Sequence, residues 1–412
     1  MKIIKTGISL FIACVVSLAL FGCNNGNAGG DIEIIVWEDE ANHEWVKDGL
    51  NEFAQRYKNT YKLAQDIKFT LIAQTEQQAI EALTNLGPTG HGADVLAFVH
   101  NQVGAAYQSN LLAPIEYVDQ VVFHNDEKAV AALTLDDVIY GYPTTGETSV
   151  LMYDEKQVSA EAVKTLEGIN TAGKKISWQI KDDAYYTFGF LSDANVFGED
   201  GKNKNSLKLD NPLTVENLLY LYGPSSLARQ TINAEDPDSA IDSLRTGASA
   251  GVVTTPYLWP IFKKLISDKG GTPKVAVLPK ITVNGTEREL LPYAGYKAYG
   301  VSSFTKHPHL SQAVANFLSS EICQIRRVIE TNCLPTIKDS SDLDDLVANS
   351  PEATIYLQQL AHSRTMPNIT LMEEMWSPGE NALTSLYNNK SLTKENIETI
   401  LQSWQSGVLS KR

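Results

Sequence analysis

Cysteine and the glycine-rich loops of nucleotide-binding proteins are what this 412-residue sequence has least of. It contains four cysteines, and no Cys-x-x-Cys pair or Cys/His cluster suggests a zinc site. Neither Gly-x-x-x-x-Gly-Lys-Ser/Thr nor Gly-x-Gly-x-x-Gly occurs, so nucleotide binding has no support and we expect no cofactor and no metal. The sequence also lacks an internal repeat, a low-complexity tract and a long flexible linker.

Basic residues are in deficit as well. Lysine and arginine number 34 against 49 aspartates and glutamates, for a formal net charge of -15. Such a surface repels nucleic acid and anionic headgroups, so we expect no nucleic-acid partner. It tolerates neutral ligands such as sugars, although the simpler interpretation is that the charge confers solubility.

The longest apolar run is short for a membrane span. It covers residues 7–22 after Lys2 and Lys5, whereas a spanning helix needs about 20 apolar residues. Residues 1–22 are therefore predicted to be a signal peptide. Their end, Leu20-Phe21-Gly22-Cys23, resembles the lipobox of bacterial lipoproteins, in which the cysteine becomes the lipid-bearing N-terminus. The alternative is an ordinary cleaved signal followed by a chance cysteine.

The rest of the chain starts with a short tether. Residues 23–31 hold mainly Asn, Gly and Ala and are predicted to be a lipid-linked flexible segment. Cys323 and Cys333 are then the cysteines left in an oxidising compartment. Their spacing leaves open one disulfide or two buried free thiols.

The pattern of the first hundred residues favours an α/β fold. Strands are predicted at 32–37, 67–73 and 93–98, with helices over 41–58, over 75–85 and from about residue 99 to Ser109. This alternation is typical of a mostly parallel sheet with helices on both faces. Further strands are expected at 138–142, 149–153, 250–254, 274–278 and 297–302. Further helices are expected at 213–222, 237–245, 258–268, 309–332, 352–363, 376–387 and 393–408. A mature chain of about 390 residues has room for two lobes with separate cores.

Two patterns that suggest enzymes do not fit their surroundings. Gly247-Ala248-Ser249-Ala250-Gly251 matches the Gly-x-Ser-x-Gly nucleophile elbow, which needs a strand before the serine and a helix after it. Here a predicted helix precedes it and a strand follows. His307-Pro308-His309 has no third metal ligand at a suitable spacing, so surface histidines are the safer interpretation.

Aromatic and carboxylate residues fall together in four predicted loops. Aromatic rings stack on the apolar faces of a pyranose, and Asp, Glu, Asn and Gln bond its hydroxyls. Any one cluster taken alone is better explained by aromatics that fill a core and acids that cover a surface. The clusters are Trp37 with Glu38, Asp39 and Glu40; Phe98 with His100, Asn101 and Gln102; Asp182 and Asp183 with Tyr185, Tyr186 and Phe188; and Met375 and Trp376 with Glu373, Glu374 and Glu380.

Several motifs in order then carry a family resemblance. They are Ile34-Ile35-Val36-Trp37, Gly90-His91-Gly92-Ala93-Asp94-Val95, Tyr107-Gln108-Ser109-Asn110-Leu111-Leu112, Tyr140-Gly141-Tyr142-Pro143 through Glu147 to Tyr153, Tyr185-Tyr186-Thr187-Phe188-Gly189, Met366-Pro367-Asn368-Ile369 and Trp376-Ser377-Pro378. Over about 340 residues the chain resembles the solute-binding proteins of ABC transporters. Within them it is similar to the maltose/maltodextrin-binding branch, nearest to the lipid-anchored receptors of Gram-positive bacteria.

The resemblance implies a periplasmic-binding-protein-like fold of two α/β lobes joined by a hinge. Lobe one would hold residues 32–145 plus 301–335, and lobe two 146–292 plus 336–412. Residues 293–300 would cross the hinge. A sugar would bind in the cleft between the lobes, which closes about it by hinge motion. The partners implied are a maltodextrin ligand, the permease subunits of the transporter and the outer face of the cell membrane, reached through the lipid on Cys23. The protein would be a monomer and not an enzyme.

Binding positions carry over where the motifs match. The resemblance implies stacking by Trp376, Tyr257, Tyr185 and Phe98, and hydroxyl bonding by Glu147 and by Asp183, which stands where a glutamate is usual. Asp39 or Glu40 would supply the acid of the first loop. Asn101 and Gln102 replace a frequent Asp-Arg pair, Glu380 stands near a frequent arginine, and Tyr257 is smaller than the usual tryptophan. These departures leave open another oligosaccharide or a disaccharide such as a trehalose-like sugar. The rival classes are an extracellular glycoside hydrolase, with Glu147 and Asp183 as its carboxylate pair, and a purely structural lipoprotein or adhesin.

Overall fold

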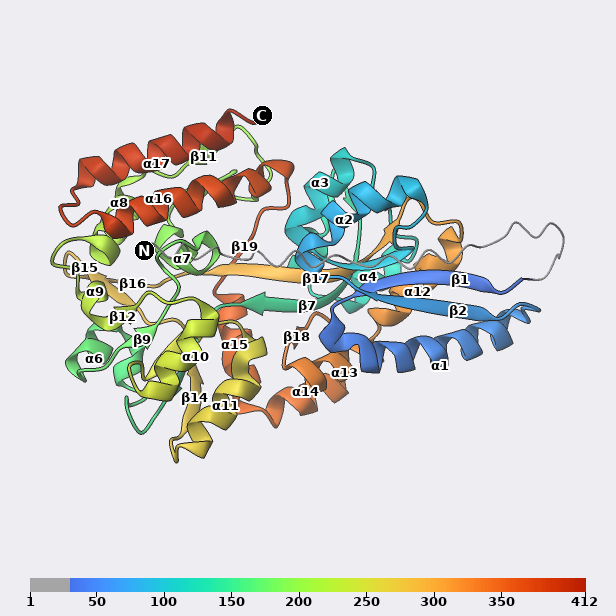
Figure 1. Cartoon of the computed structure of the whole chain (residues 1–412), viewed down its shortest axis with the longest axis horizontal. Helices are drawn as coiled ribbons and strands as arrows, with labels where there is room; N and C mark the ends of the chain where they lie inside the picture. The colour runs from blue at the N-terminus through green and yellow to red at the C-terminus, as the bar shows by residue number, and fades with distance from the viewer. Residues whose placement is uncertain (1–29) are drawn as a thin grey trace, which may run out of the picture.

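The computed structural model describes residues 30–412 and builds them into two lobes, each around its own β-sheet (Figure 1). The predicted two-lobed α/β class is confirmed. The predicted signal peptide, Cys23 and nearly all of the tether lie outside the described residues. In the part of the chain that the structure describes, no helix has the length and apolar character needed to span a bilayer.

The first sheet mixes parallel and antiparallel strands in the order β18-β7-β17-β3-β1-β2. Strand β1 pairs in parallel with β2 and β3, as the strand-helix alternation predicts, whereas β17 runs antiparallel to β3 and β7. Short strands β4 (Leu112–Ala113) and β19 (Arg364–Thr365) also pair with β17. The main strands are β1 Ile32–Glu38, β2 Ile67–Ala73, β3 Val95–Val99, β7 Tyr142–Thr148, β17 Tyr293–Ser302 and β18 Leu334–Pro335.

The second sheet has the order β12-β9-β13-β8-β14. Strand β9 pairs in parallel with β12 and β13, and β8 runs antiparallel to β13 and β14. Its strands are β8 Val150–Asp154, β9 Ile176–Ser177, β12 Ile232–Asn233, β13 Gly251–Thr254 and β14 Pro273–Ala276. Three small hairpins complete the strands: β5 Thr134–Leu135 with β6 Val138–Ile139, β10 Asn195–Val196 with β11 Leu207–Lys208, and β15 Ile281–Val283 with β16 Thr286–Arg288.

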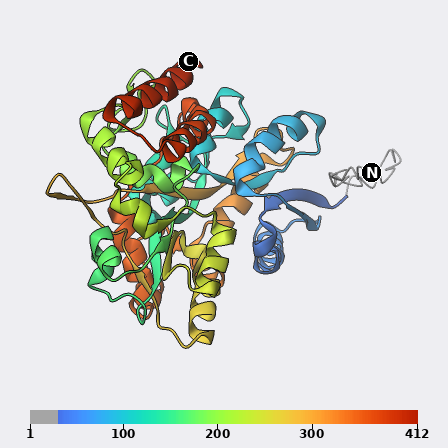
Figure 2. The same ribbon diagram turned by 60° about the vertical axis from the view of Figure 1, so that its left-hand side comes forward.

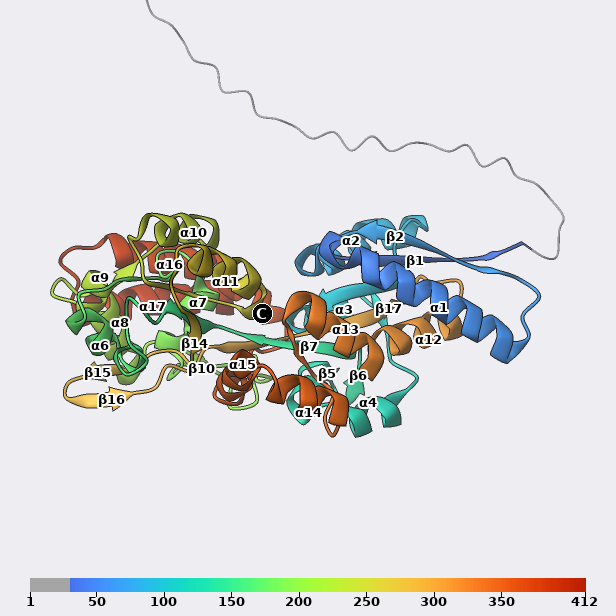
Figure 3. The same ribbon diagram turned by 90° about the horizontal axis from the view of Figure 1, so that it is seen from below.

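Helices cover the sheets. In the first lobe α1 lies on one side of β1 and β2 and α2 on the other (Figures 1 and 2). Seen from below, α14 and α15 lie in the middle of the molecule, between the helices of the two lobes (Figure 3). The helices are α1 His43–Tyr61, α2 Ala79–Leu86, α3 Val103–Gln108, α4 Val118–His124, α5 Glu127–Ala132, α6 Leu166–Thr171, α7 Ala184–Leu191, α8 Pro212–Tyr222, α9 Leu227–Thr231, α10 Pro237–Thr246, α11 Trp259–Asp268, α12 Pro308–Leu318, α13 Glu321–Thr331, α14 Ser341–Ala348, α15 Pro351–Ala361, α16 Trp376–Asn388 and α17 Lys394–Leu409.

One predicted helix is wrong in extent. The segment 309–332 folds as two helices, α12 and α13, separated at Ser319 and Ser320. Ser320 is extended, and the Ser319 hydroxyl donates to the carbonyl of Asn316. Serine side chains compete in this way with the helical backbone bonds. The resulting break turns α13 so that Cys323 and Arg327 point inward.

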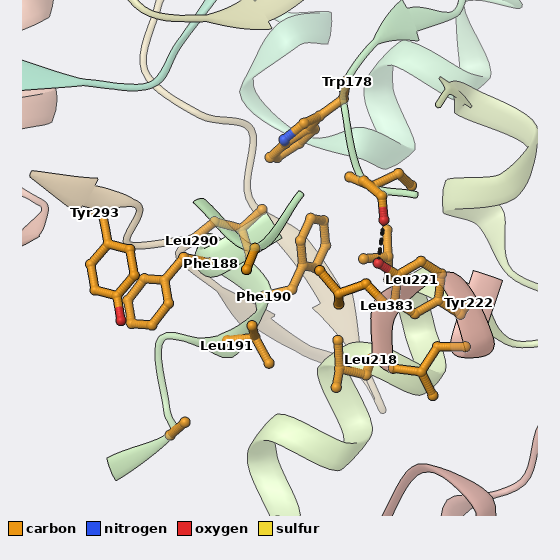
Figure 4. Close-up of a cluster of buried hydrophobic side chains, with 14 of the residues drawn as sticks. Trp178, Phe188, Phe190, Leu191, Leu218, Leu221, Tyr222, Leu290, Tyr293 and Leu383 are labelled. Carbon is orange, nitrogen blue, oxygen red and sulfur yellow. Dashed lines mark hydrogen bonds between the residues drawn. The ribbon is translucent and has the colours of Figure 1, made fainter. Parts of the chain in front are cut away.

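Each lobe has its own hydrophobic core. The first is built around Trp37, Phe98 and Tyr299, and the second around Trp178, Phe190 and Tyr222. Figure 4 shows the second core, where the ring of Phe188 lies flat against that of Tyr293. Fully burying a side chain of this size contributes about 1.5–3 kcal/mol.

Two long strands run between the lobes. Strand β7 of the first sheet is followed, after Ser149, by β8 of the second. Strand β17 starts at Tyr293 in the second core and reaches Val301 in the first, so it begins four residues before the predicted 297. The Thr148 hydroxyl donates to the Tyr293 carbonyl at 2.9 Å, which ties the two strands together at this end. The exact residue limits of the lobes stay predictions.

Candidate ligand-binding cavity

A cavity of about 530 Å³ lies beside these connecting strands and takes its walls from both lobes. This volume is in the range of small-molecule sites, which are typically 300–1,000 Å³. Its lining residues are Gln77, Val99, Asn101, Gln102, Glu147, Asp183, Ala184, Tyr185, Tyr186, Thr255, Tyr257, Gly295, Lys297, Met366, Glu373, Trp376 and Glu380.

Aromatic side chains enter the cavity from three elements of the second lobe. Tyr185 and Tyr186 lie in the first turn of α7, Tyr257 in a short 3₁₀ turn before α11, and Trp376 at the start of α16. The Tyr185 and Tyr186 rings meet edge to face, with centroids 5.4 Å apart. Flat rings on a partly exposed wall can stack on the apolar face of a ligand.

Carboxylates surround these rings. Asp183 caps α7 by accepting a hydrogen bond from the Tyr186 amide at 2.8 Å. Burial raises the pKa of Asp183, although bonds from the Tyr186 and Tyr185 amides oppose the shift. Burial likewise raises the pKa of Glu373. Together with Glu147 and Glu380, these groups give the cavity an excess of hydrogen-bond acceptors over cations.

The segment that carries Trp376 is fixed to the first lobe by polar contacts. Asn101 donates from its amide nitrogen to Glu373 Oε1 at 2.6 Å, and Asn368 donates to the carbonyls of Ala132 and Thr134. His100 is fully buried, with Nε2 2.8 Å from the Met366 carbonyl. These bonds hold the segment that leads to Trp376 against the first lobe.

Seven of the ten predicted binding residues line this one cavity. They are Asn101, Gln102, Glu147, Asp183, Tyr185, Tyr257 and Trp376. Gln102 donates to the carbonyl of Gln77, a cavity residue that no sequence pattern singled out. Their roles in binding stay predictions, since a shared wall does not identify a ligand.

Three predicted binding residues lie elsewhere. The assignment of Phe98 as a stacking residue is wrong, because its ring is fully buried in the first core against Gly141 and Gly300, and the next residue, Val99, lines the cavity instead. Asp39 caps a 3₁₀ turn by accepting from the Ala41 amide, and Glu40 is exposed. Neither is among the residues that line the cavity, and the carboxylate before them, Glu38, is buried in the lobe interior.

Sequence reasoning missed Lys297 as a cavity residue. It stands on β17, with its ammonium nitrogen 2.7 Å from Glu76 Oε2 and 3.6 Å from Glu147 Oε2. A single lysine within the otherwise uncharged run Tyr293–Ser302 was the available signal. Glu373 and Glu380 also line the cavity and were named only as neighbours of Trp376.

The patterns set aside in the sequence have structural explanations. Helix α10 precedes Ser249 and strand β13 follows it, and Ser249 is buried against Asn233, so the order is the reverse of a nucleophile elbow. His309 is exposed beside Glu116. Within residues 30–412, no group of three or more His, Cys, Asp or Glu side chains is arranged to hold a metal. Cys323 and Cys333 are buried free thiols, so of the two alternatives left open by their spacing the structure has the free thiols and not the disulfide.

Comparison with known proteins gives one family match and full-length relatives. Residues 54–355 match the family model described as bacterial extracellular solute-binding protein. The galactooligosaccharide-binding protein of Bacillus subtilis is 27% identical over 426 residues, covering 98% of this chain and 97% of that protein. The maltodextrin-binding protein MdxE of the same organism is 23% identical, covering 100% and 99%. The ligand-free maltodextrin-binding protein MalE1 of L. casei BL23 superposes with a TM-score of 0.79 at 18% identity, covering 92% and 99%.

Proposed function

This chain belongs to the bacterial extracellular solute-binding protein family, and from that premise we propose that its cavity captures an oligosaccharide for an ABC importer. The family consists of binding proteins and not of enzymes, which argues against the glycoside-hydrolase alternative. A receptor of this kind binds its solute between the lobes and presents the closed form to the permease, which reads the difference between the two states.

The observation that carries the proposal is the composition of the cavity wall. Rings of Tyr185, Tyr257 and Trp376 lie around the same space as the carboxylates of Glu147 and Asp183. A sugar ring offers two apolar faces and a rim of hydroxyls, and this wall offers surfaces for stacking together with acceptors for hydroxyl protons.

The sugar we propose is a linear α-1,4-linked maltodextrin. The order of the family motifs and the likeness to maltodextrin-binding proteins support it. A second candidate is a galactooligosaccharide, because the relative named for that ligand is 27% identical to this chain against 23% for the maltodextrin-binding one. Both are neutral oligosaccharides, consistent with a cavity rich in carboxylates.

Isothermal titration calorimetry of the chain from residue 24 onward decides between them. Maltotriose and a β-1,4-galactotriose are titrated in parallel. Heat with maltotriose alone supports the maltodextrin proposal, and heat with galactotriose alone replaces it with the second candidate. No heat with either sugar at high micromolar concentration refutes the proposed function.

Substitution tests the stacking role directly. Trp376→Ala is expected to weaken binding by about thirtyfold or more, equivalent to about 2 kcal/mol, because a central aromatic contact is lost. The matched control is Phe123→Ala, which removes a ring that is 73% exposed and lies outside the cavity wall. Equal losses in both variants, or none in either, would contradict the stacking role.

We also propose that the protein is held at the outer face of the cell membrane through lipid on Cys23. The tetrapeptide that ends in Cys23 supports this. Growth with an alkyne-labelled fatty acid should label the wild-type protein and leave a Cys23→Ala variant unlabelled. Label retained in the variant would overturn the assignment.

A further inference from the structure

A row of alternating charges leads from the interior of the first lobe to the cavity. Arg327 lies 3.2 Å from Glu38 Oε2 and 3.9 Å from Glu76 Oε1. Glu76 in turn pairs with Lys297 at 2.7 Å, and Lys297 lies 3.6 Å from Glu147. The five groups come from β1, a 3₁₀ turn before α2, α13, β17 and β7, so the chain must fold completely before they meet.

Burial makes this row expensive. The side chains of Glu38, Glu76 and Arg327 are at most 4% exposed. Transferring each charge from water costs several kcal/mol, which pairing only partly offsets. Such clusters are often found at functional sites. This row ends at the cavity, where Lys297 and Glu147 remain 23% and 21% exposed.

Lys297 stays charged in this setting. Burial opposes its charge, but the carboxylates of Glu76 and Glu147 outweigh that effect and raise its pKa well above the usual value. Among the described residues that line the cavity, its charged companions are the carboxylates of Glu147, Asp183, Glu373 and Glu380. Lys297 therefore brings a strong donor to a wall that otherwise carries charged acceptors.

The spacing of the pair leaves both groups available to a ligand. Glu147 stands opposite Gly295 in the β7-β17 ladder, so Lys297 lies two residues further along β17 on the same face. Their separation of 3.6 Å exceeds an ordinary N–H···O bond, so the two charges attract without using up a donor and an acceptor. One of the three ammonium protons is directed at Glu76, which leaves two.

We propose that Lys297 is a specificity-determining residue that donates to one hydroxyl of the bound sugar while Glu147 accepts from the adjacent hydroxyl. An ammonium cannot accept and a carboxylate cannot donate, so the pair fixes the direction of both hydrogen bonds. Glu76 is a positioning residue, because its carboxylate holds the ammonium nitrogen at the wall. This inference rests on the proposed sugar-binding function and names the residues that recognise one pair of adjacent hydroxyls on the sugar.

Calorimetry with the sugar that the wild type binds, and with its monodeoxy derivatives, tests the proposal. Lys297→Met should weaken binding of the parent sugar about tenfold or more, as expected for a lost bond to a charged group. For one monodeoxy derivative the wild type and Lys297→Met should bind equally, because the hydroxyl read by Lys297 is already missing. Lys297→Arg should restore part of the affinity.

Two further variants separate binding from folding. Glu76→Gln/Lys297→Met also removes the buried carboxylate, which the single variant leaves without its nearest cation and with only Arg327 at 3.9 Å; the double variant should unfold near the wild-type temperature and still bind weakly. Lys280→Met is the matched control, since Lys280 also lies between two glutamates, Glu287 at 2.9 Å and Glu289 at 3.5 Å, away from the cavity. It should bind as the wild type does.

The outcomes are distinct. If the wild type binds sugar and Lys297→Met binds the parent sugar and every derivative as tightly as the wild type does, the Lys297 inference fails and the proposed function stands. Wild-type affinity in the double variant also overturns it, because the loss in the single variant was then structural. If the wild type binds no oligosaccharide, the proposed function fails and takes this inference with it.

Discussion

His100 is expected to make the folded protein less stable as the pH falls below neutral. The side chain follows directly after β3 and is fully buried between β17 and the segment that leads to Trp376. Its Nδ1 accepts from the Tyr296 amide at 3.0 Å, and its Nε2 donates to the Met366 carbonyl at 2.8 Å. The neutral ring with its proton on Nε2 satisfies both bonds. Burial lowers the pKa of His100 from 6.5 to about 4.

The sign follows from proton binding. The unfolded chain takes up a proton at this histidine near pH 6.5, whereas the folded chain does so only near pH 4. Lowering the pH through this window therefore favours the unfolded state, and the loss stops below pH 4. Between pH 7 and pH 4.5 the loss is about 2 kcal/mol, since each unit of pKa difference corresponds to about 1.4 kcal/mol.

Urea unfolding at these two pH values measures the effect in the wild type and in His100→Gln. The variant should lose about 1–3 kcal/mol at pH 7, because the Tyr296 amide or the Met366 carbonyl is left without its partner. It should then lose about 2 kcal/mol less than the wild type on going to pH 4.5. His91→Gln, at an exposed histidine, serves as the control and should follow the wild type.

Equal pH sensitivity in the wild type and in His100→Gln would refute the reasoning. An NMR titration provides a second check, because the His100 ring signals should not shift until the pH approaches 4. A midpoint near 6.5 would mean that the ring reaches solvent in the folded state.

The other predictions concern Glu373 and two glycines that pack near the segment that carries Trp376. Glu373→Gln should become more stable relative to the wild type as the pH rises from about 4.5 to 7. The pKa of the buried Glu373 is raised, so ionising this acid destabilises the folded wild type over that range, whereas the glutamine stays neutral and can still accept from Asn101. An equal change in the urea unfolding of both proteins between the two pH values would contradict this. Gly104→Ala should cost about 1–3 kcal/mol, because its Cβ would overlap the Thr370 backbone nitrogen. Gly407→Ala on α17, where a Cβ meets only atoms at 3.9 Å, should instead stabilise by up to about 1 kcal/mol, and urea unfolding measures both glycine variants.

Local patterns in the sequence determined most of the secondary structure. The β-branched runs of β1 and β2 and the apolar spacing of α1, α8 and α17 appear within a few residues of their predicted limits. These elements are fixed by short-range periodicity, which one chain segment carries by itself. The aromatic and acidic residues near Asp183 and Trp376 were also visible locally, because each group is contiguous.

The face of the sheet to which each β3 side chain points was harder to predict. Its residues Val95–Val99 are apolar throughout, so the period-two alternation that would distinguish the two faces is absent. The family motif placed Phe98 at the binding site, whereas the fold turns its ring into the core and leaves Val99 at the wall. The helix break at Ser319 and Ser320 was not predicted either, because serine is tolerated within helices as well as at their ends.

What the sequence by itself determined is the set of elements and the inventory of rings and carboxylates, because both follow from neighbours along the chain. Tertiary structure alone decided which of them share a wall. Lys297 lies beside Glu76, which is 221 positions away in the sequence, and beside Glu147, which is 150 positions away. Sequence patterns could not pair them, because the interaction between two charges depends on their distance in space and not on their separation along the chain. The same holds for the two thiols, which lie ten residues apart and are buried unpaired.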